Sequence, residues 1–145
     1  NQIKTHRLML VSFNSFILVG LGGALGAMSR YGLTVISNYY NAITITGTIL
    51  SNTIGCFLMG VIFQYILNLS LEPTNNILIE QNRLLFTVGF CGSFTTLSAL
   101  ILEMHKFREV EEYFQAFIYL FGTLLAAFLC FYLGMMLVDY LIKNI

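Results

Sequence analysis

Four long apolar runs constrain the fold of this chain more than any other feature of its sequence. They cover about residues 13–36, 43–69, 84–102 and 113–142. Each can cross a bilayer, because about 20 apolar residues span its hydrocarbon core. Charged residues make up only 10% of the 145 residues, against about 25% in a soluble domain. The sequence therefore predicts a single transmembrane domain over residues 1–145, an all-α membrane protein with four transmembrane helices per subunit.

The third run departs from an ordinary membrane helix at its centre. From Gly89 to Ser98 it reads Gly-Phe-Cys-Gly-Ser-Phe-Thr-Thr-Leu-Ser, with two glycines, two threonines and two serines. Irregular backbone at membrane depth is tolerated only where it is buried in protein or lines a water-filled cavity. We therefore expect the third helix to be broken at its centre, and we expect the break to form an ion or substrate site.

Three other polar features lie within apolar runs, and each has two interpretations. Asn52, which shares a helix face with Thr48, either bonds a neighbouring helix or donates its NH2 group to an anion on a permeation path. Arg30 is either an interfacial anchor or a cation lining an aqueous vestibule. Tyr119 and Thr123 lie one helical turn apart, and they are either ordinary buried residues or members of a hydroxyl track.

Small residues recur at four-residue spacing in the first and last runs, which lets helix backbones approach closely in lipid. The pairs Gly22–Gly26 and Gly23–Ala27 lie in the first run, and Gly122, Ala126, Cys130 and Gly134 lie in the last. Residues 71–81 are predicted to be a polar loop. The charged stretch 103–112 is predicted to be a solvated connector with His105 at the surface, so no carboxylate is expected in the middle of a span.

The basic residues are divided almost evenly between the two sides of the predicted four-helix topology. One side would carry Lys4, Arg7, Arg83 and Lys143, and the other would carry Arg30, Lys106 and Arg108. Orientation normally follows an excess of Lys and Arg on the cytoplasmic side. A chain without that preference can insert both ways, which predicts an antiparallel, dual-topology dimer.

Three blocks of sequence resemble the signature blocks of the Fluc/CrcB fluoride channels. They are Gly22-Gly23-Ala24-Leu25-Gly26-Ala27-Met28-Ser29-Arg30-Tyr31, then Gly47-Thr48 followed by Ser51-Asn52 and Gly55, and then Gly89 to Thr96 with Ser98. The resemblance covers all four runs in order. It implies a passive channel that exports fluoride through the inner (plasma) membrane of a microbial cell and relieves fluoride toxicity. It also implies a homodimer with two narrow pores, and no enzymatic activity.

The resemblance also implies roles for particular residues. The pore asparagine corresponds to Asn52, the vestibule arginine to Arg30, and the hydroxyl track to Tyr119 and Thr123. A structural sodium ion would bind at the dimer centre, held by the backbone carbonyls of Gly92 and Thr95 from both subunits. Thr48, Thr96 and Ser98 supply further hydroxyl groups to the expected fluoride path.

One departure from the family pattern concerns the pore directly. Members usually carry two phenylalanines, three residues apart, just after the threonine pair, and their positive ring edges face fluoride. Leu97 and Leu100 occupy these positions here. This leaves an alternative in which the chain is a non-conducting or half-conducting partner of a sister subunit. A small multidrug–proton antiporter is a further alternative, but it requires a carboxylate embedded in the membrane.

Overall fold

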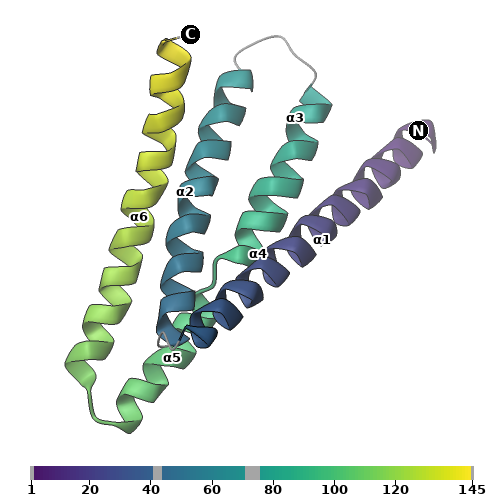
Figure 1. The fold of residues 1–145 in the computed structure, drawn as a ribbon. Helices are drawn as coiled ribbons and strands as arrows, with labels where there is room; N and C mark the ends of the chain where they lie inside the picture. The colour runs from purple at the N-terminus through teal and green to yellow at the C-terminus, as the bar shows by residue number, and fades with distance from the viewer. Residues whose placement is uncertain (1, 41–43, 71–75, 145) are drawn as a thin grey trace.

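The computed structural model describes the backbone of residues 2–40, 44–70 and 76–144, and the side chains of 13–40, 46–69 and 77–144. Every regular element in these ranges is a helix (Figure 1). The elements are α1 (Gln2–Tyr39), α2 (Thr44–Ser70), α3 (Asn76–Asn82), the π-helix η1 (Arg83–Cys91), α4 (Gly92–Phe94), α5 (Leu97–Glu109) and α6 (Tyr113–Lys143). Elements α3 to α5 together form one span, so the chain has four segments long and apolar enough to cross a membrane. The predicted helical class is confirmed.

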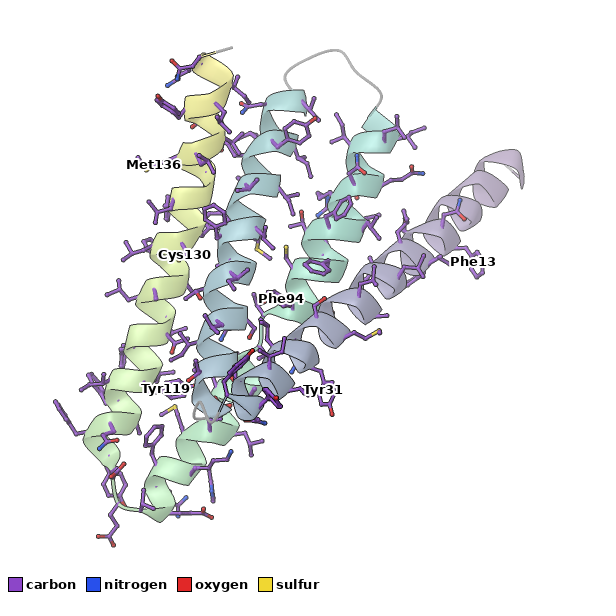
Figure 2. All side chains as sticks on the ribbon, viewed as in Figure 1. Phe13, Tyr31, Phe94, Tyr119, Cys130 and Met136 are labelled. Carbon is purple, nitrogen blue, oxygen red and sulfur yellow. The ribbon has the colours of Figure 1, made fainter. Side chains whose placement is uncertain are left out.

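The four spans alternate in direction along the chain. Figure 1 shows α2 and α6 running side by side in the same direction, with α1 and the α3–α5 span running in the opposite direction. In the same view α1 runs obliquely and crosses the third span near α4. Most large apolar side chains point away from the bundle, as Figure 2 shows for Phe13 and Met136, and this suits a surface that faces lipid.

Glycines allow the helices to cross with their backbones in contact. A Cβ atom added to Gly26 on α1 would lie 2.2 Å from the carbonyl oxygen of Phe90, and one added to Gly60 on α2 would lie 2.0 Å from that of Phe131. Gly134 on α6 makes the reciprocal approach, since its added Cβ would lie 2.3 Å from the Phe57 oxygen. The predicted packing role of the small residues is therefore correct at these crossings. Gly122 is different, because it is exposed and nothing lies within 4 Å of an added Cβ.

The third span begins earlier than the sequence predicted. Helix α3 starts at Asn76, whereas we expected a loop over residues 71–81 and a helix only from residue 84. The prediction failed because it was based on hydropathy, and residues 76–82 lie before the apolar run. Residues 71–75, the first part of the predicted loop, lie outside the described residues.

The third span is broken at Thr95 and Thr96, as predicted. The φ and ψ angles are −80° and 151° at Thr95, and −151° and 120° at Thr96, so both residues are extended. A new helix, α5, starts at Leu97, and the Thr96 hydroxyl caps its first turn by accepting a 3.2 Å hydrogen bond from the Ala99 N–H. Two extended residues therefore connect two helical pieces inside one span.

The charged stretch after residue 102 is not a solvated connector at its start. Helix α5 continues to Glu109, and the Glu103 side chain is buried. Leu100, Glu103 and Phe107 lie on one helical face, which explains why a residue in a charged stretch turns inward. His105 is exposed and pairs with Glu109, as expected for a surface residue.

Candidate functional site

Asn52 on α2 holds the broken backbone of the third span through both ends of its amide. Its Nδ2 donates a 3.1 Å hydrogen bond to the carbonyl oxygen of Thr96, and its Oδ1 accepts a 2.7 Å bond from the Thr96 N–H. The side chain is buried. An amide NH2 group has two donor hydrogens, so one of them remains for another acceptor. Asn52 therefore bonds a neighbouring helix and still keeps a donor at the break.

A cavity of about 190 Å³ opens beside this amide. It is lined by Asn52, Cys56, Thr95, Thr96, Leu97, Leu100, Thr123, Leu124 and Ala127. Its polar groups come from α2, from the break and from α6, and the remainder of its lining is apolar. A narrow cavity with a few convergent polar groups is the usual form of a site for a small ligand or ion.

A second polar cluster lies among α2, α5 and α6, toward the end of the bundle where α5 meets α6. The buried Glu103 carboxyl group accepts a 2.8 Å hydrogen bond from the Thr48 hydroxyl and a second bond from the Tyr119 hydroxyl. Tyr119 is buried against Phe107, with ring centroids 5.8 Å apart (Figure 2 labels Tyr119). The prediction that Glu103 belongs to a solvated connector is therefore wrong, because its side chain is buried near the end of the third span.

The two clusters follow one another along the same pair of helices. Thr48 and Asn52 are one turn apart on α2, and Tyr119 and Thr123 are one turn apart on α6. The Thr123 hydroxyl donates a 2.7 Å hydrogen bond to the Tyr119 carbonyl oxygen and lines the cavity. The predicted hydroxyl track therefore consists of residues that share one buried face, and Ala127 continues that face.

The break also changes the hydrogen bonding of two carbonyl groups. In a continuous helix the Thr96 N–H would donate to Gly92 and the Ala99 N–H would donate to Thr95. Here the first donates to Asn52 and the second to the Thr96 hydroxyl. The carbonyl oxygens of Gly92 and Thr95 have therefore lost their helical donors, and Gly92 is exposed on the surface of the subunit.

Arg30 on α1 reaches the same break from the other side. Its Nε donates a 3.2 Å hydrogen bond to the carbonyl oxygen of Ser93, in the last turn before the extended residues. The side chain is half-buried and lies well before the end of α1 at Tyr39. Arg30 is therefore not an interfacial anchor at the end of its helix in this structure.

Leu97 and Leu100 both line the cavity but in different environments. Leu100 is 1% exposed, whereas Leu97 is 61% exposed on the surface of the isolated subunit. Phe94 is buried and stacks on Phe90, with ring centroids 5.6 Å apart (Figure 2 labels Phe94). Phe94 is absent from the cavity lining, so it does not replace an aromatic ring at either leucine position.

Most of the predicted site residues lie together, although two important contacts were missed. Thr96 and the exposed Ser98 share a 3.1 Å contact between their hydroxyl oxygens at the start of α5. Sequence reasoning missed Glu103, and it also missed the contact of Arg30 with Ser93. The spacing of Leu100, Glu103 and Phe107 was the available signal for the first, while the second depends on how α1 crosses the third span.

The chain is a small helical membrane protein in which polar groups from the first, second and last spans meet at the broken third span. The family model described as "CrcB-like protein, Camphor Resistance (CrcB)" matches residues 17–135. The chain therefore belongs to the CrcB family, and the resemblance inferred from its three blocks is confirmed.

Curated relatives give the same assignment. The chain is 38% identical over 125 residues to the fluoride-specific ion channel FluC of Prosthecochloris aestuarii, which covers 86% of this chain and 93% of the relative. It is 35% identical over 131 residues to the fluoride-specific ion channel FluC 1 of Bacillus anthracis, which covers 89% of this chain and 90% of the relative. The relative from Chlorobium chlorochromatii, with the same name as the first, is 35% identical over 118 residues.

Proposed function

We propose that this protein is a passive, fluoride-selective ion channel that lets fluoride leave the cell and so relieves its toxicity. The observation that carries the proposal is the cavity at the break of the third span, where a few polar groups converge in a mostly apolar lining, in a chain whose family relatives are named fluoride-specific ion channels. Such a protein is a transporter and not an enzyme. We assign it to the inner (plasma) membrane.

The polar groups beside the cavity are suited to a small anion. Fluoride is strongly hydrated, so a pore must replace its water shell with donors placed close together. The second Asn52 N–H and the hydroxyls of Thr96 and Ser98 supply donors at the break. The hydroxyls of Thr48, Tyr119 and Thr123 continue the path along α2 and α6, and each would donate to an ion by turning away from its present acceptor, which is Glu103 or the Tyr119 carbonyl oxygen. Chloride would be rejected by the width of the path and the placement of its donors.

A dual-topology homodimer would close the cavity at the break. The cavity opens to the surface of a single subunit, where Leu97 is 61% exposed, so a second copy would close it. Four basic residues on one side of the predicted topology against three on the other, with Arg30 counted among the three, give the chain little orientation preference. Two oppositely inserted copies would pair around a two-fold axis in the membrane plane.

A sodium ion at the dimer centre fits the carbonyl groups at the break. Sodium is a hard cation that prefers oxygen ligands, and carbonyls freed at a broken membrane helix are suited to bind one. The Gly92 and Thr95 carbonyls have lost their helical donors, and Gly92 is exposed where a partner would approach. In this proposal both subunits contribute the two carbonyls, and the ion neutralises the negative ends of two helix dipoles.

Fluoride efflux from liposomes tests the proposed function. Liposomes loaded with potassium fluoride would receive only this purified protein, and a fluoride electrode would follow efflux after valinomycin is added. A passive anion channel needs the compensating potassium current, so efflux should depend on valinomycin, and matched potassium chloride liposomes should release little chloride. Efflux without valinomycin would instead indicate coupled exchange.

The alternative of a partner subunit rests on Leu97 and Leu100, which replace two aromatic rings in the family pattern. It predicts no efflux from a well-folded preparation of this chain alone. Fluoride efflux should then appear when the chain is co-reconstituted with a sister subunit. Fast, fluoride-selective efflux from this chain alone would exclude the alternative.

A further inference from the structure

Arg30 bonds to the end of a helix and not to a carboxylate. Its Nε donates to the carbonyl oxygen of Ser93 at 3.2 Å, and its own carbonyl oxygen accepts a 3.2 Å bond from the Thr34 hydroxyl. Glycines at positions 22 and 26 hold α1 against the same stretch of the third span, since an added Cβ at either would collide with backbone oxygens of that stretch. The guanidinium group is thus supported by a rigid helix crossing.

The Ser93 carbonyl group is one that the break would otherwise leave without a donor. In a continuous helix it would accept from the Leu97 N–H, but Thr95 and Thr96 are extended and carry Leu97 away. The last carbonyls of a helix also carry the negative end of the helix dipole, which a cation stabilises. Arg30 therefore meets both the hydrogen-bonding and the electrostatic needs of this end.

The break is held on both sides by side chains from other spans. Arg30 from α1 bonds Ser93, two residues before the first extended position, and Asn52 from α2 bonds the backbone N–H and carbonyl oxygen of Thr96. Between these contacts lie the backbone and the hydroxyls that line the cavity. A shift at Ser93 would move Thr95 and Thr96 relative to Asn52.

We propose that Arg30 is a positioning residue whose directed Nε–H bond to the Ser93 carbonyl fixes the broken backbone that lines the ion path. The inference rests on the proposed channel function, and it differs from a general attraction of anions by positive charge. A planar guanidinium presents donors in a fixed geometry, whereas a lysine ammonium is a flexible point charge. Lysine would therefore preserve the charge at position 30 but lose this contact.

Chemical rescue of fluoride efflux separates the two roles. We expect Arg30→Ala and Arg30→Lys each to lower efflux by about tenfold. Ethylguanidinium added on both sides should restore efflux to Arg30→Ala, while ethylammonium, which carries the same charge, should not. Full efflux from Arg30→Lys, or equal rescue by the two cations, would overturn the proposal. Arg108→Lys changes an exposed cation near the end of α5 without changing the charge balance, and it serves as the control with unchanged efflux.

A structural readout keeps the test valid if a variant is inactive for another reason. The ¹³C shift of a labelled Ser93 carbonyl reports its hydrogen bond, and hydrogen exchange at the Thr96 N–H reports the position of the break. Both should change in Arg30→Lys and stay constant in Arg108→Lys. An unchanged Ser93 shift in Arg30→Lys would overturn the proposal. If the wild-type protein does not conduct fluoride, the proposed function fails, while these two signals still decide whether Arg30 holds the break.

Discussion

Individual polar side chains at the break hold the structure and line the cavity at the same time. Asn52 bonds both polar atoms of one residue of the neighbouring span and keeps one amide hydrogen unused. Glu103 is a buried carboxyl group that depends on hydroxyl donors from two other helices. Replacing one nitrogen or oxygen atom of such a side chain should therefore affect both the position of the backbone at the site and the passage of an ion.

Replacing Asn52 should reduce fluoride efflux sharply. Asn52→Ala removes both hydrogen bonds to Thr96, and Asn52→Asp keeps the acceptor but loses the donor and adds a negative charge beside the path. We expect efflux to fall by about tenfold or more, with the elution volume in size-exclusion chromatography unchanged from the wild type. Normal efflux from Asn52→Ala would show that the amide contributes only to packing.

Replacing the two cavity leucines by phenylalanine should raise fluoride efflux or leave it unchanged. Leu97 is exposed on the isolated subunit, so a larger ring fits there, whereas Leu100 is 1% exposed and its neighbours must move. The double variant Leu97→Phe/Leu100→Phe would be compared with the wild type by electrode. A large loss of efflux would indicate that this pore uses a different arrangement.

Removing the Tyr119 hydroxyl should destabilise the protein through Glu103. Tyr119→Phe leaves the buried carboxyl with one of its two hydroxyl donors, and an unsatisfied buried acceptor costs about 1–3 kcal/mol. Thermal unfolding in detergent would measure the loss. Tyr132→Phe alters a more exposed tyrosine on the same helix and should leave the midpoint unchanged. Equal midpoints for the two variants would contradict the assigned role of Glu103.

At the scale of whole elements, close helix crossings organise the bundle. Elements α2 and α6 approach at Gly60 and Gly134, while α1 approaches the third span at Gly22, Gly26 and Gly89. These backbone contacts bring the Thr48–Asn52 face of α2 beside the Tyr119–Thr123 face of α6. The position of each polar group thus depends on a crossing one or more turns away.

Adding a methyl group at a crossing should destabilise the bundle, whereas the same change elsewhere should not. Gly60→Ala places a Cβ 2.0 Å from the Phe131 oxygen, so the helices must separate, at a cost of about 1–3 kcal/mol. Gly122→Ala meets open space in the subunit and should gain up to about 1 kcal/mol from its helix propensity. Unfolding curves of both variants would test this, and a Gly60→Ala protein as stable as Gly122→Ala would refute the packing assignment.

The four spans, the break in the third span and its polar residues could be predicted from the sequence for a physical reason. Hydrocarbon forces spans to be long and apolar, so the runs are visible, and a polar, glycine-rich centre such as Gly89–Ser98 stands out against them. The early start of the third span at Asn76 and the burial of Glu103 were not predictable from hydropathy. The burial of Glu103 depends on hydroxyl donors from two neighbouring helices, and those contacts exist only in the folded chain.

At the scale of the whole molecule, most large apolar side chains face outward, and the cavity at the break opens at the surface of the subunit. The surface of the membrane-spanning segments is thus largely apolar. Its basic residues give little preference for either orientation. These properties are the basis of the proposed pairing of oppositely inserted copies.

Added charge should convert the chain to a single orientation and stop conduction by that variant alone. Glu111→Lys/Glu112→Lys adds basic residues between α5 and α6, and Asn144→Lys adds one at the opposite end. Each variant should insert in a single orientation, and the two variants should insert in opposite orientations. Labelling of engineered terminal cysteines from one side of the membrane would measure the orientation. Fluoride efflux should be lost for each variant alone and return when the two are co-expressed. Full efflux from a singly oriented variant would exclude the antiparallel dimer.

The glycine crossings have a consequence for how this sequence can diverge over evolutionary time. Where two backbones touch, no side chain except hydrogen fits, so selection has almost no choice at those few positions. Along the lipid-facing surface, one apolar residue serves nearly as well as another, and drift can exchange them freely. A lineage can therefore replace most of its residues while it keeps the same fold, which is consistent with relatives that share only 31–38% identity with this chain.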